Sequence, residues 1–240
     1  MSNADLVVAG HQPNFFPWFG YFEKMLWSDI FVFSDDVQYT KQNYVNRVAY
    51  PEGRDSTPRY LTLPVCRGDD YSINAKKYVK DKKALDKIIK TIEINMGGLP
   101  FFSDLEEVIR NFAVDYQRFE TVADLNISTN IRLAKLMGIT ATTKRGCDIG
   151  LSGWHSNQRL LRRQEILQSR VYLSGAGSSE YTDFEAFESR GIRHVTITYS
   201  LGPKLFGDSL KFTVLYGIAS VGLNVITRAV DRHKKYDSKP

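Results

Sequence analysis

Two short apolar runs near the start of the chain, separated by one helical stretch, restrict the fold more than any other feature. Residues 5–10, DLVVAG, and residues 29–36, DIFVFSDD, are typical of buried strands because apolar side chains follow one another in each. Between them, Phe19, Phe22 and Leu26 recur at helical spacing. Two strands joined through a helix lie parallel in a sheet. The sequence therefore predicts a β-α-β unit at the beginning of the chain.

Strands and helices continue to alternate toward the C-terminus. Further strands are expected at 140–145, 170–175 and 194–200, and further helices at 156–169, 183–191 and 210–219. This alternation predicts an α/β fold with a mostly parallel sheet. Without a repeat or a clear linker in the sequence, we expect a single domain over residues 1–240.

Two segments depart from the alternation. Residues 43–70 alternate apolar and polar side chains around a turn-forming stretch, which predicts an antiparallel hairpin. Residues 78–138 carry three consecutive helical patterns and are expected to form a helical insertion. Ser103 and Glu106 have the spacing of a capping box at the start of the second of these helices, and Gly138 suits the residue after the third.

The charge composition favours a small anionic partner over a nucleic acid. Lys and Arg outnumber Asp and Glu by 32 to 27, giving a formal net charge of +5. The excess is spread along the chain, with local clusters at 76–90, at 159–170 and in the C-terminal tail, whereas nucleic-acid-binding domains usually concentrate their basic residues on one face. We therefore expect an anionic small-molecule substrate and no nucleic acid.

The sequence also bears on the compartment. Cys66 and Cys147 lie far apart and lack metal-ligand spacing, which favours a reducing environment. No apolar run approaches the roughly 20 residues of a membrane span, and the first residues lack the basic start and apolar centre of a signal peptide. We expect a cytoplasmic protein without a membrane span, of unspecified oligomeric state.

Three polar loops follow predicted strands. They comprise residues 10–20, residues 34–47 and residues 174–181. Ligands of open α/β sheets gather at the carboxyl ends of the strands. Because parallel strands end at the same edge, the three loops are expected to meet and form one site.

Three residues in these loops are candidates for catalysis. His11 leaves the first strand where an imidazole can donate, accept or carry a proton near neutral pH, although a histidine in that place can equally cap neighbouring carbonyls. Asp35 and Asp36 follow the second strand, where α/β enzymes often carry acidic residues. If the strand continues through them, they point to opposite faces, and one serves the site while the other caps a turn.

The remaining candidates are expected to bind substrate. They are Gln12, Asn14, Trp18, Gln38, Lys41, Arg47, Ser174, Gly175, Gly177, Ser178 and Tyr181. Lys41 and Arg47 suit a phosphate or carboxylate, and the loop 174–181 is able to bring backbone N–H groups close to an anion. No P-loop, G-x-G-x-x-G or H-E-x-x-H motif is present, so the sequence names no cofactor and no metal ligands.

The stretch from His11 to Arg47 resembles the opening of the WbqC-like protein family. The order and spacing of HQP, PWFGYF and DDVQY carry the resemblance, and looser matches extend along most of the chain, with the C-terminal part departing most. Members of this family are associated with gene clusters for O-antigen and related surface polysaccharides. The resemblance implies a cytoplasmic enzyme of sugar-nucleotide modification.

A second resemblance concerns architecture. A strand, a turn bearing His11, a helix and a second strand also open the Rossmann-like nucleotidylyltransferase domains, whose turn carries a second histidine that is absent here. This layout supports a Rossmann-like sheet.

Together the observations favour a group-transfer enzyme, of acyl or aminoacyl type, that modifies a nucleotide-activated or lipid-linked sugar in surface-polysaccharide biosynthesis. His11 would act as general base, Asp35 or Asp36 as its orienter and Arg47 as a phosphate clamp. Two alternatives stay open: a ligase or nucleotidylyltransferase that uses ATP with Mg²⁺ held by Asp35 or Asp36, and a non-catalytic sugar-binding protein of the same pathway.

Overall fold

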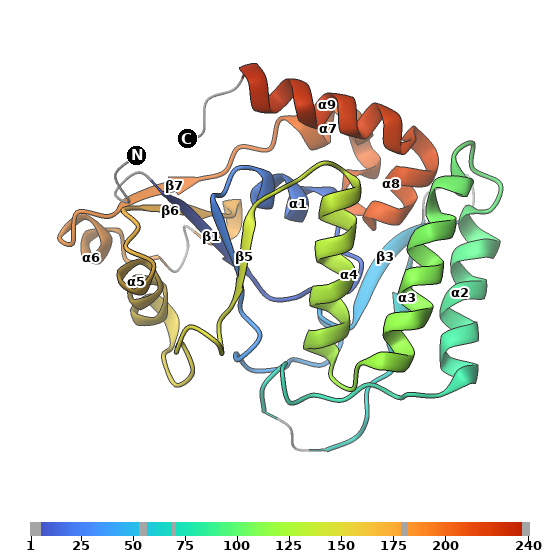
Figure 1. Ribbon diagram of the computed structural model, residues 1–240, viewed down its shortest axis with the longest axis horizontal. Helices are drawn as coiled ribbons and strands as arrows, with labels where there is room; N and C mark the ends of the chain where they lie inside the picture. The colour runs from blue at the N-terminus through green and yellow to red at the C-terminus, as the bar shows by residue number, and fades with distance from the viewer. Residues whose placement is uncertain (1–5, 53–56, 69–70, 179–181, 237–240) are drawn as a thin grey trace.

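A five-stranded parallel sheet forms the centre of the molecule (Figure 1). The computed structural model describes residues 6–52, 57–68, 71–178 and 182–236. The strands of the sheet are β1 (Val7–His11), β2 (Ile30–Phe33), β5 (Thr142–Arg145), β6 (Val171–Ser174) and β7 (Arg193–Thr196), in the order β5-β2-β1-β6-β7. Each neighbouring pair is parallel. The predicted α/β fold with a mostly parallel, Rossmann-like sheet is confirmed.

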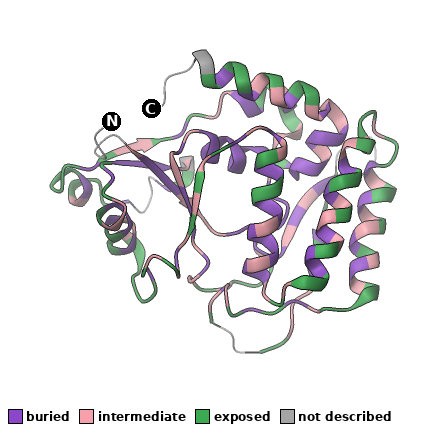
Figure 2. Cartoon of the chain, in the orientation of Figure 1, coloured by how far each residue is buried: buried purple, intermediate pink, exposed green. Residues whose placement is uncertain are grey.

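The central strand β1 is buried on both faces. Val8 and Ala9 are fully buried, and Figure 2 draws this strand largely in the colour of buried residues. Helix α1 (Phe19–Leu26) returns the chain to β2, where His11 pairs in register with Phe33. The predicted β-α-β unit is thus present, and it fixes His11 at the carboxyl end of the sheet.

The predicted hairpin is a separate two-stranded antiparallel sheet. It consists of β3 (Arg47–Glu52) and β4 (Thr57–Thr62), with Arg47 opposite Thr62. Its turn lies outside the described residues. The hairpin does not extend the central sheet. A residue on its strands, such as Arg47, is therefore not part of the carboxyl edge of that sheet.

Three helices follow the hairpin along the chain and precede β5. They lie side by side in Figure 1. They are α2 (Lys82–Met96), α3 (Glu106–Arg118) and α4 (Val122–Leu136). The predicted capping box is wrong: Ser103 lies inside a 3-10 turn, η2 (Phe102–Leu105), and α3 begins without a side-chain cap. Instead, the carboxylate of the neighbouring Asp104 accepts a hydrogen bond from the backbone N–H of Leu223. Gly138 has φ = +80° after α4, as predicted.

The remaining helical elements follow β5 along the chain. They are α5 (Ser156–Ile166), η3 (Ala176–Ser178), α6 (Phe184–Glu188), α7 (Leu201–Phe206), η4 (Gly207–Lys211) and α8 (Val214–Val221), followed by the last helix, α9 (Leu223–Tyr236).

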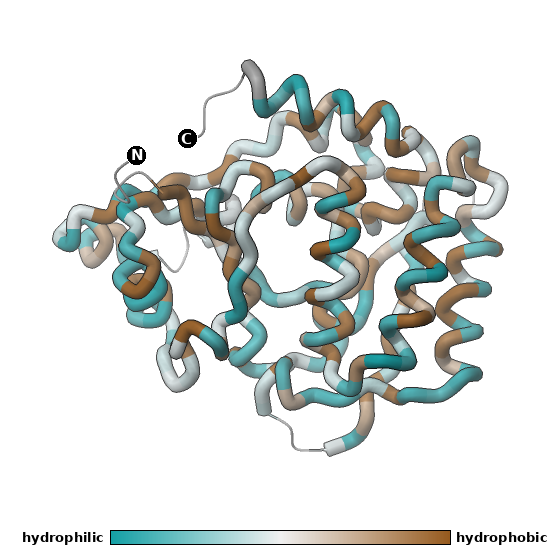
Figure 3. Tube along the Cα trace, in the orientation of Figure 1, coloured by the Kyte–Doolittle hydropathy of each residue, from teal (hydrophilic) through white to brown (hydrophobic). Residues whose placement is uncertain are grey.

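The sequence predicted one final helix over 210–219, and the structure differs. Helices α8 and α9 are separated at Gly222, whose φ of +89° ends the first of them. Helix α9 takes in much of the basic tail because Ile226 and Val230 on one face are fully buried, and hydrophilic and hydrophobic segments alternate along it in Figure 3. Within the described residues, no single helix has the length and apolar composition of a membrane span; α8 and α9 pass that test only together, at a bend of 104°.

Glu23 joins α1 to the C-terminal part of the chain. Its carboxylate is fully buried and accepts hydrogen bonds from the backbone N–H groups of Ser200, Leu201 and Gly202, at 2.7 to 2.8 Å. Replacing Glu23 with alanine leaves three backbone donors, two of them buried, without this acceptor. We therefore expect a loss of about 3 kcal/mol or more in the free energy of unfolding, measured by urea denaturation. Glu106→Ala, at an exposed position, serves as the control. A loss below about 1 kcal/mol in Glu23→Ala would contradict this role.

Candidate functional site

A cavity of about 640 Å³ lies at the carboxyl ends of the parallel strands. We call it the sheet-edge cleft. Its lining residues are Gly10, His11, Gln12, Trp18, Tyr21, Lys24, Ser34, Val37, Arg159, Leu160, Arg163, Tyr172, Gly175, Gly177, Ser178 and Tyr199. Three of these, Lys24, Arg159 and Arg163, are cationic, and among the described residues no carboxylate lines this cavity.

A second cavity, of about 750 Å³, adjoins the sheet-edge cleft. The two share Gln12, Val37 and Arg159 as lining residues. Asp36 and Gln38 line this second cavity. The loops after β1 and β2 therefore contribute to both cavities, as the sequence led us to expect of strands that end at one edge.

Lys24 on α1 lines the cleft beside the end of β1. Its side chain is 5% exposed, and Nζ donates a hydrogen bond to the carbonyl oxygen of Gly10 at 2.9 Å. Burial, together with the charge of Arg163, lowers the pKa of Lys24 to about 7. No carboxylate of the described residues forms an ion pair with it, so near neutral pH this amine is divided between its charged and neutral forms.

Arg163 on α5 is the second buried cation of the cleft. It is 3% exposed, its guanidinium lies over the Tyr172 ring at 5.0 Å, and Nε and Nη2 lack a hydrogen-bond partner. Burial lowers its pKa. Gly10 makes room for it, since a Cβ at that position would lie 2.2 Å from Nη1 of Arg163. A glycine at the end of β1 thus allows a guanidinium to approach the strand.

Arg159, one turn earlier on α5, is held by Asp36. Two hydrogen bonds join them, Nη2 to Oδ1 at 2.5 Å and Nη1 to Oδ2 at 3.0 Å, and both side chains are nearly buried. Nη1 also donates to the carbonyl oxygen of Leu151. Gly146 leaves space for this ion pair, because a Cβ there would lie 2.3 Å from Oδ1 of Asp36. Asp36 therefore fixes a cation at the junction of the two cavities.

His11 lines the cleft, and its imidazole is neutral. Nδ1 lies 3.2 Å from the carbonyl oxygen of Gln12, and the ring meets Tyr21 edge-on at 5.1 Å. Burial, with the charge of Lys24, lowers the pKa of His11 to about 3. At neutral pH, His11 is therefore uncharged and able to donate or accept a hydrogen bond.

Trp18 forms an aromatic wall of the cleft. Its ring packs edge-on against Tyr199 at 5.0 Å. It lies across the backbone of Gly20, where a Cβ would come within 2.1 Å of the indole. The spacing Trp-x-Gly in the sequence thus has a physical cause: the glycine lets the tryptophan fold over the first turn of α1 and face the cavity.

The loop after β6 brings Gly175, Gly177 and Ser178 to the cleft. The Ser178 hydroxyl donates to the carbonyl oxygen of Gly175 at 2.8 Å, which closes the turn. Ser174 is directed elsewhere, since its hydroxyl contacts Val195 and Thr196 of β7. Tyr181 lies outside the described residues.

Asp35 and Asn14 do not line either cavity. Asp35 is fully buried and forms an ion pair with Arg145, from Nε to Oδ2 at 2.7 Å. It also accepts a hydrogen bond from the thiol of Cys147, whose pKa rises to about 12 through burial and this contact. Asn14 is buried beneath the loop, and its carbonyl oxygen accepts a hydrogen bond from Asn130.

Lys41 and Arg47 are likewise not among the residues that line either cavity. Lys41 is exposed. Arg47 belongs to β3, where its guanidinium lies over the Tyr60 ring at 4.2 Å. Arg47 is thus held on the hairpin, and Lys41 lies in the loop that precedes it.

Sequence reasoning missed Lys24, Arg159 and Arg163. The basic cluster at 159–170 was visible, but helical periodicity does not tell which of its members faces the sheet. For Lys24 one signal was present: it lies among Tyr21, Phe22 and Met25, in a helix whose residues are apolar almost throughout. A lysine in such surroundings is a candidate for a buried functional amine.

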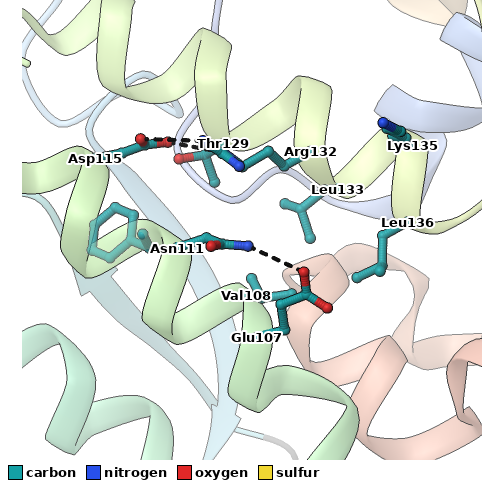
Figure 4. Close-up of a pocket in the computed structure, with 10 residues that line it drawn as sticks. Glu107, Val108, Asn111, Asp115, Thr129, Arg132, Leu133, Lys135 and Leu136 are labelled. Carbon is teal, nitrogen blue, oxygen red and sulfur yellow. Dashed lines mark hydrogen bonds and ion pairs between the residues drawn. The ribbon is translucent and has the colours of Figure 1, made fainter.

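A third cavity, of about 390 Å³, lies between α3 and α4 (Figure 4). Its polar side chains are mostly partnered: Arg132 forms an ion pair with Asp115, and Asn111 contacts Glu107. Because those charges neutralise each other within the insertion, this cavity has less capacity for an anion than the sheet-edge cleft.

The fold and the cleft define a class: an α/β protein of Rossmann-like architecture with a cationic cleft at the carboxyl edge of its sheet. The chain belongs to the WbqC-like protein family, whose sequence pattern matches residues 12–206. It is also 23% identical over 193 residues to the uncharacterized protein Rv1507c of Mycobacterium tuberculosis (strain ATCC 25618 / H37Rv). The aligned residues cover 80% of this chain and 82% of that protein. The family match ends with α7, so α8 and α9 lie beyond it, in the part that departs most from the family motifs.

Proposed function

We propose that this protein is a group-transfer enzyme whose sheet-edge cleft binds a nucleotide-activated sugar, or another phosphate-bearing sugar or acyl donor, during surface-polysaccharide synthesis. One observation carries the proposal. Lys24 and Arg163 are two buried cations in one cavity, and neither has a carboxylate partner among the described residues.

Buried charges without a counter-ion are costly, because desolvation is not repaid by an opposite charge. A bound phosphate or diphosphate repays it and gives Nε and Nη2 of Arg163 hydrogen-bond acceptors. Arg159 adds a third cation on the same helix. The cleft is thus organised for an anion, and arginine is well suited to bind phosphate through two parallel hydrogen bonds.

The size and walls of the site suit a sugar nucleotide. Small-molecule sites typically enclose about 300 to 1,000 Å³, and the cleft of about 640 Å³ adjoins a further cavity. Trp18 and Tyr199 offer aromatic faces for a base or a sugar ring. In this assignment the phosphates contact Arg163, while Gln12, Gln38 and His11 contact hydroxyl or amide groups of the sugar.

The alternative with ATP and Mg²⁺ requires Asp35 or Asp36 to bind the metal. Each carboxylate already forms an ion pair, with Arg145 and Arg159 respectively. Binding a metal at Asp36 would take the carboxylate from the buried Arg159 guanidinium, which is costly. Binding at Asp35 would break its ion pair with Arg145, which would keep Asp124 as a partner. The transfer hypothesis needs no such rearrangement.

A binding experiment tests the anion site. A panel of UDP- and dTDP-linked sugars is expected to raise the melting temperature of the protein by mass action, and Arg163→Met is expected to weaken the binding of the active compound by about 30-fold or more, measured by isothermal titration calorimetry. Arg162→Met, at an exposed neighbouring position on α5, should bind like the unaltered protein.

The outcomes separate the three functions. A shift with ATP and Mg²⁺ but with no nucleotide sugar would favour the ligase alternative. Equal binding by Arg163→Met would remove the proposed anion site. For catalysis, the bound sugar is incubated with thioester and aminoacyl donors, and mass spectrometry is expected to detect the acylated sugar; binding without a product from any donor would favour a sugar-binding protein.

A further inference from the structure

We propose that Lys24 is the acid–base residue of the transfer reaction, and that its neutral amine takes the proton from the acceptor group of the substrate. This inference rests on the proposed function, because the acceptor is a group of the sugar bound in the sheet-edge cleft. It assigns to Lys24 a role beyond that of an anion-binding cation.

The position of Lys24 supports this role. Its Nζ is tethered to the carbonyl oxygen of Gly10, the residue directly before His11 at the end of β1. The side chain lines the same cavity as His11, Gln12 and Arg163. A single hydrogen bond to a carbonyl holds the amine in place and leaves its other nitrogen valences for the cavity.

The groups around Lys24 keep part of it neutral. Arg163 on α5, His11 on β1 and Tyr172 on β6 line the same cavity as Lys24. The pKa of Lys24 is lowered by burial first and by the charge of Arg163 second. A general base works best when its pKa is near the operating pH.

His11 is less suited to accept the proton. Its pKa of about 3 means that protonating the imidazole at neutral pH is strongly unfavourable, in a buried site that already contains Lys24 and Arg163. A neutral imidazole instead suits the orientation of the substrate, as a hydrogen-bond donor or acceptor. In this assignment His11 binds and orients, and Lys24 moves the proton.

The chemical step balances without another reactant. The amine or hydroxyl of the sugar attacks the carbonyl carbon of the acyl donor, a new C–N or C–O bond forms, and the attacking group gives its proton to Nζ of Lys24. The bond from the carbonyl carbon to the leaving group breaks, and the leaving group departs with the electron pair. The Lys24 ammonium then donates the proton to that group and returns to the neutral amine.

The first test measures the amine itself and needs no substrate. The intact protein is labelled with trace acetic anhydride at pH 6 to 11, and the extent of labelling at each lysine is measured by peptide mass spectrometry. We expect Lys24 to reach half-maximal reactivity near pH 7. Lys87, exposed on α2, is measured in the same experiment for comparison. A midpoint for Lys24 like that of Lys87, or an absence of labelling at Lys24 in the native protein, would overturn the proposal.

The second test compares two substitutions. Lys24→Arg keeps a cation that does not deprotonate, so it is expected to bind the nucleotide sugar within about threefold of the unaltered protein while the transfer rate falls about 100-fold or more. Lys24→Met is expected to lose both binding and transfer. A Lys24→Arg protein that transfers at an undiminished rate would refute the acid–base role.

The two proposals fail in different ways. If no nucleotide sugar binds while Lys24 still titrates near pH 7, the proposed substrate is wrong, and the acid–base assignment in sugar transfer is withdrawn with it. If the sugar binds and is acylated while Lys24 labels like a surface lysine, the proposed function stands and only the role of Lys24 is wrong.

Discussion

Asp36→Ala is expected to lower the free energy of unfolding by about 3 to 5 kcal/mol, the cost of removing one partner of a buried ion pair. Asp36 and Arg159 are joined by two hydrogen bonds and are both nearly buried. Without the carboxylate, the guanidinium keeps only the carbonyl oxygen of Leu151 as its acceptor. Urea denaturation at pH 7 gives the value.

A double substitution distinguishes the ion pair from simple loss of packing. Asp36→Leu combined with Arg159→Met replaces both charges by apolar groups, and we expect it to recover most of the stability lost in Asp36→Ala. The double variant should still lose affinity for the nucleotide sugar, because Arg159 lines the cleft. A double variant as unstable as Asp36→Ala would show that the unpaired charge is not the cause.

The stability of the unliganded protein is expected to rise with pH above 7 because of Lys24. The pKa of Lys24 is about 7 in the folded protein, and that of a lysine in an unfolded chain is about 10.4. Between these values the unfolded chain binds more protons, so raising the pH favours the folded state. Linkage gives a gain of about 2 kcal/mol between pH 7 and pH 9.

Lys24→Met removes this contribution. The difference in unfolding free energy between the two proteins is therefore expected to change by about 2 kcal/mol over the same interval, measured by urea denaturation at several pH values. His11 contributes little to this pH dependence, because its pKa is about 3 in the folded protein and about 6.5 in the unfolded chain. Both values lie below the interval from pH 7 to pH 9. Parallel pH profiles for the two proteins would contradict a lowered pKa at Lys24.

The sequence predicted which residues meet at the edge of the sheet where strand order decides it, and not where helices or the hairpin decide it. His11, Gln12 and Gly175 follow parallel strands, and parallel strands end at one edge, so their convergence follows from the β-α-β pattern. Asp35 and Asp36 were expected to face opposite ways if the strand continued through them. β2 ends at Phe33, yet the two carboxylates do form separate ion pairs. Which of them faces the cavities depended on Arg145 and Arg159, two residues more than 100 positions further along the chain.

Arg47 illustrates the opposite case. It follows the second strand closely in sequence, and its charge suits a phosphate. Its strand pairs with β4 instead of joining the central sheet, so the guanidinium lies on Tyr60. The anion-binding role passes in our proposal to Arg163, which lies on the helix between β5 and β6.

The sequence by itself determined the α/β class, the parallel β-α-β start, the hairpin and the carboxyl edge as the place where the polar loops meet, because hydrophobic periodicity and chain connectivity are local properties. Only the tertiary structure decided which charges are buried and which are paired. Lys24 and Arg163 became uncompensated cations because α1 and α5 pack on the sheet beside Gly10. Their protonation and affinity for anions depend on the dielectric and the neighbouring charges that this packing creates.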